Sequence, residues 1–434
     1  MSGRSMGVMV AVMLVSAVPA HGQGTGEAPS TQFVDPVRGL SIEEAVQMAL
    51  SSEPSLREAR TGLDAARGMR QQAALRPNPS VMVERRDVPR GMDAQTMASV
   101  EWPLDLARRP GRIAMAEAQT RLTELSLADR ERRLAADVRS RYGAVVMGAA
   151  VLDVLADMAS VTRRQRELTA ARVADGAAPS VDRDLLDVEL GRLEADVYLQ
   201  RGRVEASLAA LRRLVAIPAS SPLRLKDTLE EARRHVPVQG RTSAGDGLRA
   251  DVREADARVA AADARIDAVR RDGTREVSVF GGYMRMDSGF PQLGQTPSGR
   301  LEPVSGVFHY LTGGLRVTLP FNRNQGELQA ARADRAGASA ALDAVRLSAE
   351  TEQAGAAASL EAARRAVDVL AATRTTARRV LDIVSQSHEL GRATLPDVLA
   401  ERRRVIDVER AYVETAGAEY DAAVMVNLVM GGVR

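Results

Sequence analysis

The sequence lacks several features that enzymes depend on. Its 434 residues include no cysteine, which excludes disulfides and thiolate chemistry and leaves no amino-terminal cysteine for a lipid anchor. The four histidines lie far apart, and no glycine-rich phosphate loop precedes a helix. These absences argue against an enzyme, a cofactor or a resident metal centre. His388-Glu389 is most simply the solvated end of a helix.

Long apolar runs are also missing after the first 20 residues. Residues 1–22 carry Arg4 and then an apolar run that ends in Val18-Pro19-Ala20, which predicts a secretory signal cleaved after Ala20 or Gly22. No later stretch reaches the roughly 20 apolar residues that a membrane span needs. We therefore expect an exported chain without a transmembrane helix.

Excess charge of one sign is absent as well. Charged residues make up 27 % of the chain, yet the net charge is only +2. Arginines alternate with acidic residues, as in Arg130-Glu131-Arg132-Arg133. This mixture predicts solvated helix faces rather than a nucleic-acid partner.

What the chain does contain is an internal repeat. Gly176 and Gly391 are 215 residues apart (391 minus 176), and four further matches share this offset: Gly111 with Gly326, Asp182 with Asp397, Arg163-Arg164 with Arg378-Arg379, and Leu155 with Leu370. Upstream the offset shrinks to 196, as between Leu56 and Val252 (252 minus 56), which indicates a longer loop between residues 287 and 306. The chain is predicted to be a tandem duplication.

Each repeat is predicted to run helix, strand, strand, long helix, tip turn, helix. Prolines are missing from 111–178, 181–217, 238–290 and 321–395, which permits long helices there. A helix over 112–174 would be roughly 95 Å long, and the flanking helices over 42–75 and 181–217 would together match its length. Apolar residues at helical spacing in 321–395 favour antiparallel coiled-coil packing.

The expected divisions follow from this order. They are a signal peptide (1–22), a flexible segment (23–40), a first repeat (41–217), a linker (218–246) and a second repeat (247–434). The first repeat holds strands at about 80–86 and 94–103 and a tip turn at 174–180; the second holds strands at about 276–286 and 307–319 and a tip turn at 390–395.

The strand segments alternate between apolar and polar positions. In 307–319 the odd positions are mainly apolar and the even ones mainly polar, so that one face suits lipid and the other water. Several of the few aromatic residues lie here, and we interpret four as a membrane-interface set: Trp102, Tyr283, Phe308 and Tyr310. Met284 and Met286 lie on one strand face that suits soft Cu(I), although apolar packing inside a barrel is the favoured interpretation.

Four strands are too few for a closed barrel, and an open sheet in lipid would leave backbone groups unpaired. Oligomerisation is therefore expected. Three copies would supply 12 strands, and this argument alone leaves two or four copies open. A small soluble β-domain on a helical stalk, or a periplasmic coiled-coil scaffold, is the alternative, although neither explains an alternating sheet with aromatic residues.

In this order of elements the sequence resembles the outer-membrane efflux protein family, the TolC-like channels of tripartite pumps. The residues that carry the resemblance are Leu40-Ser41-Ile42-Glu43-Glu44-Ala45 with Pro54, Pro77-Asn78-Pro79, Trp102-Pro103-Leu104, Leu319-Pro320-Phe321, and the turns 176–185 and 391–399. The resemblance implies a mainly helical protomer with a small β part. It further implies a homotrimer whose 12-stranded barrel crosses the outer membrane and continues as a periplasmic helical tunnel.

The resemblance also assigns roles at the tips. Asp182 and Asp397, six residues after their glycines, match a family Asp at the periplasmic entrance, where copies from a trimer would form charged rings. A helix-capping role is equally compatible with both. The tip arginine of the family matches Ala393, with Arg392 beside it, and a second Asp is replaced by Ala400. Docking of a periplasmic adaptor is carried over to Arg172, Val173, Gly176, Ser180, Leu390, Gly391 and Thr394.

The implied function is passive export from an adaptor and an inner-membrane pump, of the resistance-nodulation-division type, to the exterior. Pro77-Asn78-Pro79 and the segment 105–112 look most like the heavy-metal branch, the cobalt-zinc-cadmium and copper-silver exporters. Drug efflux and type I protein secretion remain open, because selectivity in such systems resides in the pump.

Overall fold

The computed structural model describes residues 29–87, 94–236, 249–321 and 324–430, so the expected signal peptide lies outside the described residues. The elements are a 3-10 helix η1 (Pro29–Gln32), the helices α1 (Ile42–Ser52), α2 (Pro54–Ala74), α3 (Arg109–Ala174), α4 (Ser180–Leu214), α5 (Leu229–His235), α6 (Ala250–Asp272), α7 (Gln325–Glu389) and α8 (Leu395–Met430), and the strands β1 (Ser80–Asp87), β2 (Ala94–Pro103), β3 (Glu276–Gln295) and β4 (Leu301–Thr318). The fold is mainly helical with a small antiparallel sheet, as the sequence predicts.

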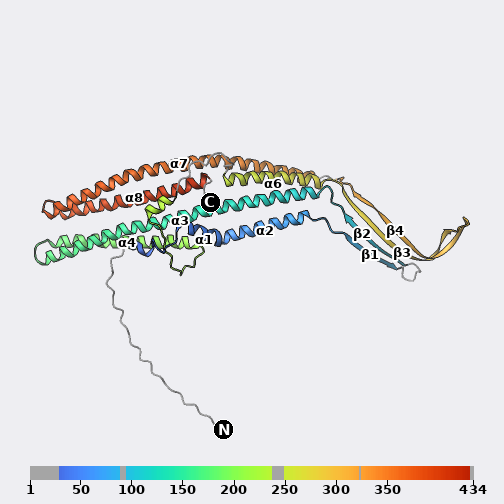
Figure 1. Cartoon of the computed structure of the whole chain (residues 1–434), viewed down its shortest axis with the longest axis horizontal. Coiled ribbons are helices and arrows are strands. Elements are labelled where there is room, and N and C mark those ends of the chain that lie inside the picture. The colour runs from blue at the N-terminus through green and yellow to red at the C-terminus, as the bar shows by residue number, and fades with distance from the viewer. Residues whose placement is uncertain (1–28, 88–93, 237–248, 322–323, 431–434) are drawn as a thin grey trace, which may run out of the picture.

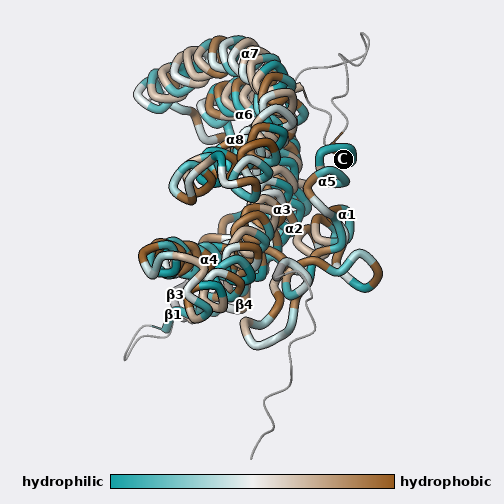
Figure 2. Tube along the Cα trace, turned by 90° about the vertical axis from the view of Figure 1, so that its left-hand side faces the viewer, coloured by the Kyte–Doolittle hydropathy of each residue, from teal (hydrophilic) through white to brown (hydrophobic). Residues whose placement is uncertain are grey.

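The helices form one long, open layer. α3 and α7 run the length of the helical part, and the sheet continues from its far end (Figure 1). α2 and α4 follow one another along one side of α3, while α6 and α8 follow one another between α3 and α7. Seen along the helices, they lie one above another from α7 to α4, with α1 and α5 on one side (Figure 2). Across the layer the order is therefore α2/α4, α3, α6/α8, α7.

The first helical segment differs from the expectation. We predicted one helix over 42–75, whereas α1 ends at Ser52 and α2 begins at Pro54. The backbone of a residue before proline is biased away from the helical region, and Glu53 accordingly has φ −64° and ψ 125°. The Glu53 carboxylate accepts hydrogen bonds from the backbone N–H groups of Ser55 at 2.6 Å and Leu56 at 3.1 Å, which caps α2.

The second hairpin also differs. The extra residues between 287 and 306 were expected as a loop, but most of them extend β3 and β4, with a register shift between Ser288 and Gln292. Antiparallel ladders are held by backbone hydrogen bonds, so a hairpin continues where the apolar alternation ends. The four strands pair in the order β1-β2-β3-β4, and all neighbours are antiparallel.

The main core lies where α1, α5 and the N-terminal segment cover the middle of α3 and α8. Tyr142 is fully buried, and its hydroxyl donates to the Asp227 carboxylate at 2.7 Å. The described part of the segment expected to be flexible is packed here: Phe33 is buried, and Leu40 bridges to Leu225 in the linker. Burial of Phe33 and these backbone bonds hold residues 29–40 in place.

One stretch of α3 corrects a further expectation. By length and composition alone, α3 contains a segment apolar enough to span a membrane. Its apolar side chains include Val145, Val146 and Leu152, which are buried in the main core. Contacts with neighbouring helices account for part of this hydrophobicity, since 39 % of the stretch is buried.

Candidate functional site

The end of the layer away from the sheet consists of two equivalent helical hairpins. α3 turns into α4 at Gly176, and α7 turns into α8 at Gly391; both glycines have φ +72°. Ala177 N–H donates to Arg172 O at 2.7 Å, and Arg392 N–H donates to Ser387 O at 2.8 Å. These bonds satisfy the last carbonyls of each long helix in the same way, so the duplicated sequence gives duplicated tips.

Asp182 and Asp397 occupy equivalent positions in the two repeats, but they differ in their contacts. The Asp397 carboxylate accepts from the Thr394 N–H at 2.9 Å and the Thr394 hydroxyl at 2.6 Å, and these hydrogen bonds lower the pKa of Asp397. This is a helix-capping arrangement at the start of α8. Asp182 lies in the first turn of α4, where Pro179 is the N-cap and supplies no side-chain cap. Unlike Asp397, Asp182 therefore has a half-buried carboxylate that does not cap its helix.

The remaining tip residues of the prediction are brought together at these turns. Arg172, Gly176, Ser180, Leu390, Gly391, Arg392 and Thr394 are exposed, and Val173 is half-buried. They belong to two separate hairpins of one chain, which lie side by side at this end (Figure 1). The tips therefore present polar side chains together with Leu390, an exposed apolar one.

Sequence reasoning missed the contacts that join the two hairpins. Leu186 of α4 packs with Leu395 and Leu399 of α8 in a small buried cluster. One turn further on, the buried Glu189 carboxylate accepts from Arg403 Nη2 at 2.6 Å and from Arg192 at 3.0 Å. An apolar contact and an ion pair thus tie α4 to α8.

The pKa of Glu189 reflects this link. Burial alone would raise it, but the hydrogen bonds and charges of Arg403 and Arg192 outweigh burial and lower the pKa. Arg402 points to the other side of α8, where Nη2 donates to Gln165 Oε1 on α3 at 2.7 Å. Burial lowers the pKa of Arg402, opposed by the charge of Glu189. The run Arg402-Arg403-Arg404 was the available sequence signal.

The sheet at the opposite end has two chemically different faces, defined by register. The apolar face carries Val81, Val83, Ala98, Val100, Trp102, Val277, Val279, Gly281, Tyr283, Leu311, Gly313, Leu315 and Val317. Farther from the helices the same face becomes polar, with Arg85, Asp87, Thr96, Arg285, Asp287 and His309. The mixed face carries Ser80, Met82, Glu84, Arg86, Gln95, Met97, Ser99, Glu101, Ser278, Phe280, Gly282, Met284, Met286, Phe308, Tyr310, Thr312 and Arg316. In β2 and β3 the apolar face is the more exposed, so the sheet is concave toward the mixed face.

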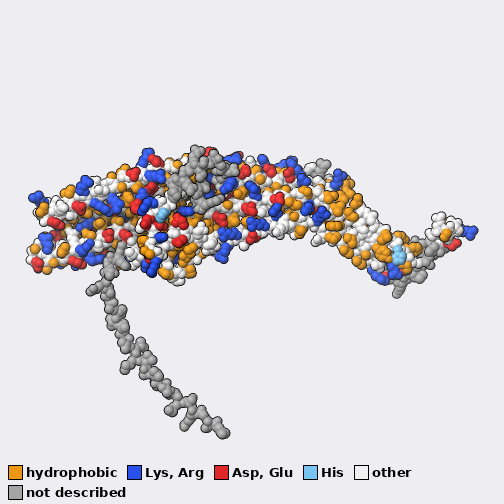
Figure 3. Space-filling model, in the orientation of Figure 1, with side chains coloured by type: hydrophobic (Ala, Val, Ile, Leu, Met, Phe, Trp, Pro, Cys, Tyr) orange, Lys and Arg blue, Asp and Glu red, His pale blue; other side chains and the backbone are white. Residues whose placement is uncertain are grey.

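This register divides the four aromatic residues predicted as one interface set. Trp102 and Tyr283 lie on the apolar face, and the Trp102 indole N–H donates to Pro77 O at 3.0 Å. Phe308 pairs with Met286, and Tyr310 with Met284, so both lie on the mixed face. The space-filling view shows apolar side chains gathered over the sheet and its junction with the helices, whereas charges of both signs cover the helices (Figure 3).

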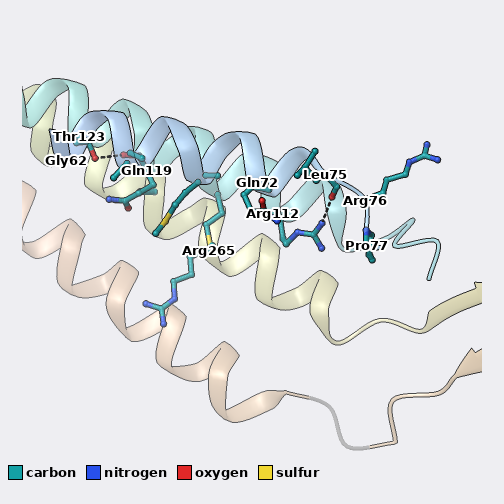
Figure 4. A pocket seen from close by; sticks show the side chains of 16 residues that line it. Gly62, Gln72, Leu75, Arg76, Pro77, Arg112, Gln119, Thr123 and Arg265 are labelled. Carbon is teal, nitrogen blue, oxygen red and sulfur yellow. Dashed lines mark hydrogen bonds between the residues drawn. The ribbon is translucent and has the colours of Figure 1, made fainter. Parts of the chain in front are cut away.

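Where the helices approach the sheet, a groove of about 920 Å³ opens between α2, α3 and α6 (Figure 4). Its floor is apolar and includes Met69 and Met115. Two of the three arginines at its margin are engaged elsewhere, since Arg112 pairs with Asp105 at 2.5 Å and Arg265 with Asp334 at 2.8 Å. Among the described residues, no group of three or more His, Cys, Asp or Glu side chains is arranged to hold a metal ion.

Comparison with known proteins gives one family and several structures. The family model described as outer membrane efflux protein matches residues 247–432, which is the second repeat. A search of curated protein sequences gave no match.

Three solved structures share the fold over nearly their whole length. CusC, described in a study of folding and transmembrane channel formation, is 15 % identical with a TM-score of 0.73 and covers 91 % of this chain and 93 % of its own. The outer membrane protein VceC of Vibrio cholerae is 18 % identical (TM-score 0.71; 90 % and 96 % covered). The MtrE outer membrane channel of Neisseria gonorrhoeae is 17 % identical (TM-score 0.68; 94 % and 94 % covered). This fold is the one that the sequence predicts.

Proposed function

We propose that this protein is the outer-membrane channel of a tripartite efflux system, working with a periplasmic adaptor and an inner-membrane pump of the resistance-nodulation-division type. One observation carries the proposal: an open, alternating four-stranded sheet continues directly into an open layer of helices about 100 Å long. The fold shared with outer-membrane channels and the family match of the second repeat support it. None of these features points to catalysis.

The unpaired edges support a homo-oligomer, and the resemblance to the channel family sets the number of copies at three. β1 and β4 each have one neighbour within the described chain, and lipid offers no hydrogen bonds to the edge that remains. The helical layer is also open at its two edges. These edges carry exposed apolar side chains such as Val188 on α4 and Val369 on α7. Three copies joined edge to edge give a 12-stranded barrel in the membrane and a helical tunnel below it.

The two faces of the sheet indicate which side of the barrel wall meets lipid and which lines the lumen. Its apolar, convex face meets lipid, with Trp102 and Tyr283 near the membrane boundaries, and its concave mixed face lines the lumen. The tips then lie far into the periplasm. There Asp182, Asp397 and Arg392 surround the entrance, and the exposed turns with Arg172, Ser180, Leu390 and Thr394 form the adaptor-docking surface.

A sharp test of the channel uses Asp182, because Asp397 already serves as a cap. The wild-type protein and Asp182→Asn, extracted from outer membranes, are compared in planar bilayers. We expect discrete openings for both, with lower cation selectivity in the variant, since a ring of negative charge attracts cations. A soluble, non-conducting wild-type protein would contradict the channel and favour a periplasmic scaffold.

We further propose that the exported compounds are heavy-metal cations. The resemblance of Pro77-Asn78-Pro79 and of the segment 105–112 to the heavy-metal branch supports this. The test is gene deletion followed by comparison of metal tolerance with tolerance of dyes and drugs. Loss of metal tolerance alone supports the proposal; loss of drug tolerance alone, or of a secreted protein, identifies the alternative cargo.

A further inference from the structure

Four methionines form a continuous cluster on the concave mixed face of the sheet. Met97 of β2 pairs directly with Met284 of β3. Met286 follows two residues along β3, and Met82 of β1 pairs with Ser99, which places it diagonally next to Met97. Side chains in direct and diagonal register are within reach of each other when they are long. Three strands that are far apart in the sequence thus bring four thioethers to one patch, which we call the methionine patch.

The contacts around the patch are polar on one side and aromatic on the other. The Gln95 amide Nε2 donates to the Met284 sulfur. Met284 pairs with Tyr310 and Met286 with Phe308. Glu84 pairs with Met97, and its carboxylate is joined to Arg86 at 3.4 Å, so the nearest charges offset each other. The patch is therefore soft and close to neutral.

Packing does not account for these side chains. Among the elements that the structure describes, the main contacts of the sheet are between neighbouring strands, and no helix packs over the mixed face. In a 12-stranded barrel this face borders water, where polar side chains are the rule. Met82 remains 50 % exposed, and Met97, Met284 and Met286 are half-buried by their neighbours on the sheet. Four thioethers on a water-facing wall need another explanation.

We propose that the methionine patch binds a soft monovalent cation, Cu(I) or Ag(I), on the lumen wall. Thioether sulfur is soft and uncharged and suits such cations, whereas Zn²⁺ is held by thiolate, imidazole and carboxylate ligands. The inference rests on the proposed channel for its lumenal position and narrows the cargo of that channel to soft monovalent metals. A neutral thioether site also suits conduction, because a bound ion must be able to leave.

The experiment uses the full-length protein in detergent and Ag⁺ as the probe, in chloride-free buffer. The variant Met97→Leu/Met284→Leu removes the paired thioethers and keeps apolar side chains of similar volume. The matched control, Met69→Leu/Met115→Leu, removes two methionines from the groove between α2, α3 and α6. Isothermal titration measures binding, and X-ray absorption at the silver edge identifies sulfur ligands.

We expect the wild type and the control to bind about one Ag⁺ per chain through sulfur, and the patch variant to lose this binding. Zn²⁺ should not compete for the site. Equal Ag⁺ binding in all three proteins, or no sulfur ligation in the wild type, would overturn the proposal. Conductance in potassium salt is measured on the same samples. Conduction without Ag⁺ binding refutes only the metal site, whereas Ag⁺ binding without conduction refutes only the channel.

Discussion

At the scale of single residues, the two tip glycines are required by backbone conformation rather than by space. Gly391 has φ +72°, and a Cβ added there would meet no heavy atom within 4 Å. The same is true of Gly176. A side chain at either position is therefore opposed only by the left-handed backbone.

This gives a prediction with opposite signs at two positions. Gly391→Ala should lower stability by about 1 kcal/mol, because alanine is strained at positive φ. Gly355→Ala, in the middle of α7 and equally free of close contacts, should raise stability by roughly 0.5–1 kcal/mol. Thermal unfolding of the purified proteins measures both. Equal effects of the two substitutions would show that the turn carries no strain.

Residue chemistry also explains what the sequence could predict about the sites. The tip turns follow from glycine and proline, whose backbone preferences are local, and α3 and α7 each end two positions before the glycine, at Ala174 and Glu389. Only half of the methionine patch, Met284 and Met286, could be found in this way, because Met97 and Met284 meet only through the register of β2 with β3. Phe308 and Tyr310 were grouped with Trp102 because all three lie in predicted strand segments, although the alternation of 307–319 already assigned even positions to the polar face.

At the scale of elements, the ion pair between α4 and α8 couples the two tip hairpins. Glu189 is buried, whereas the side chains of Arg403 and Arg192 are about half exposed. The lowered pKa of Glu189 means that its contribution to stability is complete above the ordinary carboxyl pKa. The contribution is lost as the pH falls through the lowered, folded-state pKa.

Glu189→Gln should therefore lower stability at neutral pH by about 1–2 kcal/mol, since a buried acceptor loses charged partners. The difference from wild type should shrink as the solution is acidified. Glu194→Gln is the matched control, because its pair with Arg163 is solvent-exposed and should contribute less than about 0.5 kcal/mol. Unfolding midpoints across a pH series test this, and a difference independent of pH would mean that the charge of Glu189 is not what matters.

The element boundaries show where local signals suffice and where they do not. Pro54 marks the break between α1 and α2, but a helical pattern on both sides concealed it. The extension of β3 and β4 past residue 287 follows from backbone pairing, which leaves little trace in the pattern of side chains. The apolar stretch of α3 illustrates the reverse error, in which composition resembles a membrane span and tertiary contacts explain part of it.

At the scale of the whole molecule, the open layer predicts that assembly depends on its edges. Val369 of α7 is 65 % exposed, although Val367, two residues earlier, is buried in the core, so Val369 faces away from the layer. Exposed apolar side chains on a long edge are typical of surfaces that pack against another copy.

Val369→Asp should therefore reduce the fraction of trimer, because a buried carboxylate without a partner is costly at an interface. Val37→Asp is the control, since Val37 is 85 % exposed and belongs to the N-terminal segment rather than to an edge helix. Native mass spectrometry from detergent measures the oligomer. An unchanged trimer in Val369→Asp would place the contact between copies on a different surface.

The end-to-end stacking of the shorter helices has a mechanical consequence. Gln353 of α7 donates to Val429 O near the end of α8 at 3.1 Å, which marks the level where α8 stops. From there to Glu389, α7 continues as one unbroken helix for about 50 Å. A pivot of about 10° at this level would displace the tip by roughly 9 Å. A small rotation at mid-height therefore becomes a large movement of the tip turn. The belt formed by α1, α5 and the N-terminal segment contacts α3 and α8 on the tip side of this level, where Arg233 of α5 pairs with Glu419 and Ser30 N–H donates to the Asp153 carboxylate, so it stiffens the layer beside this part of α7.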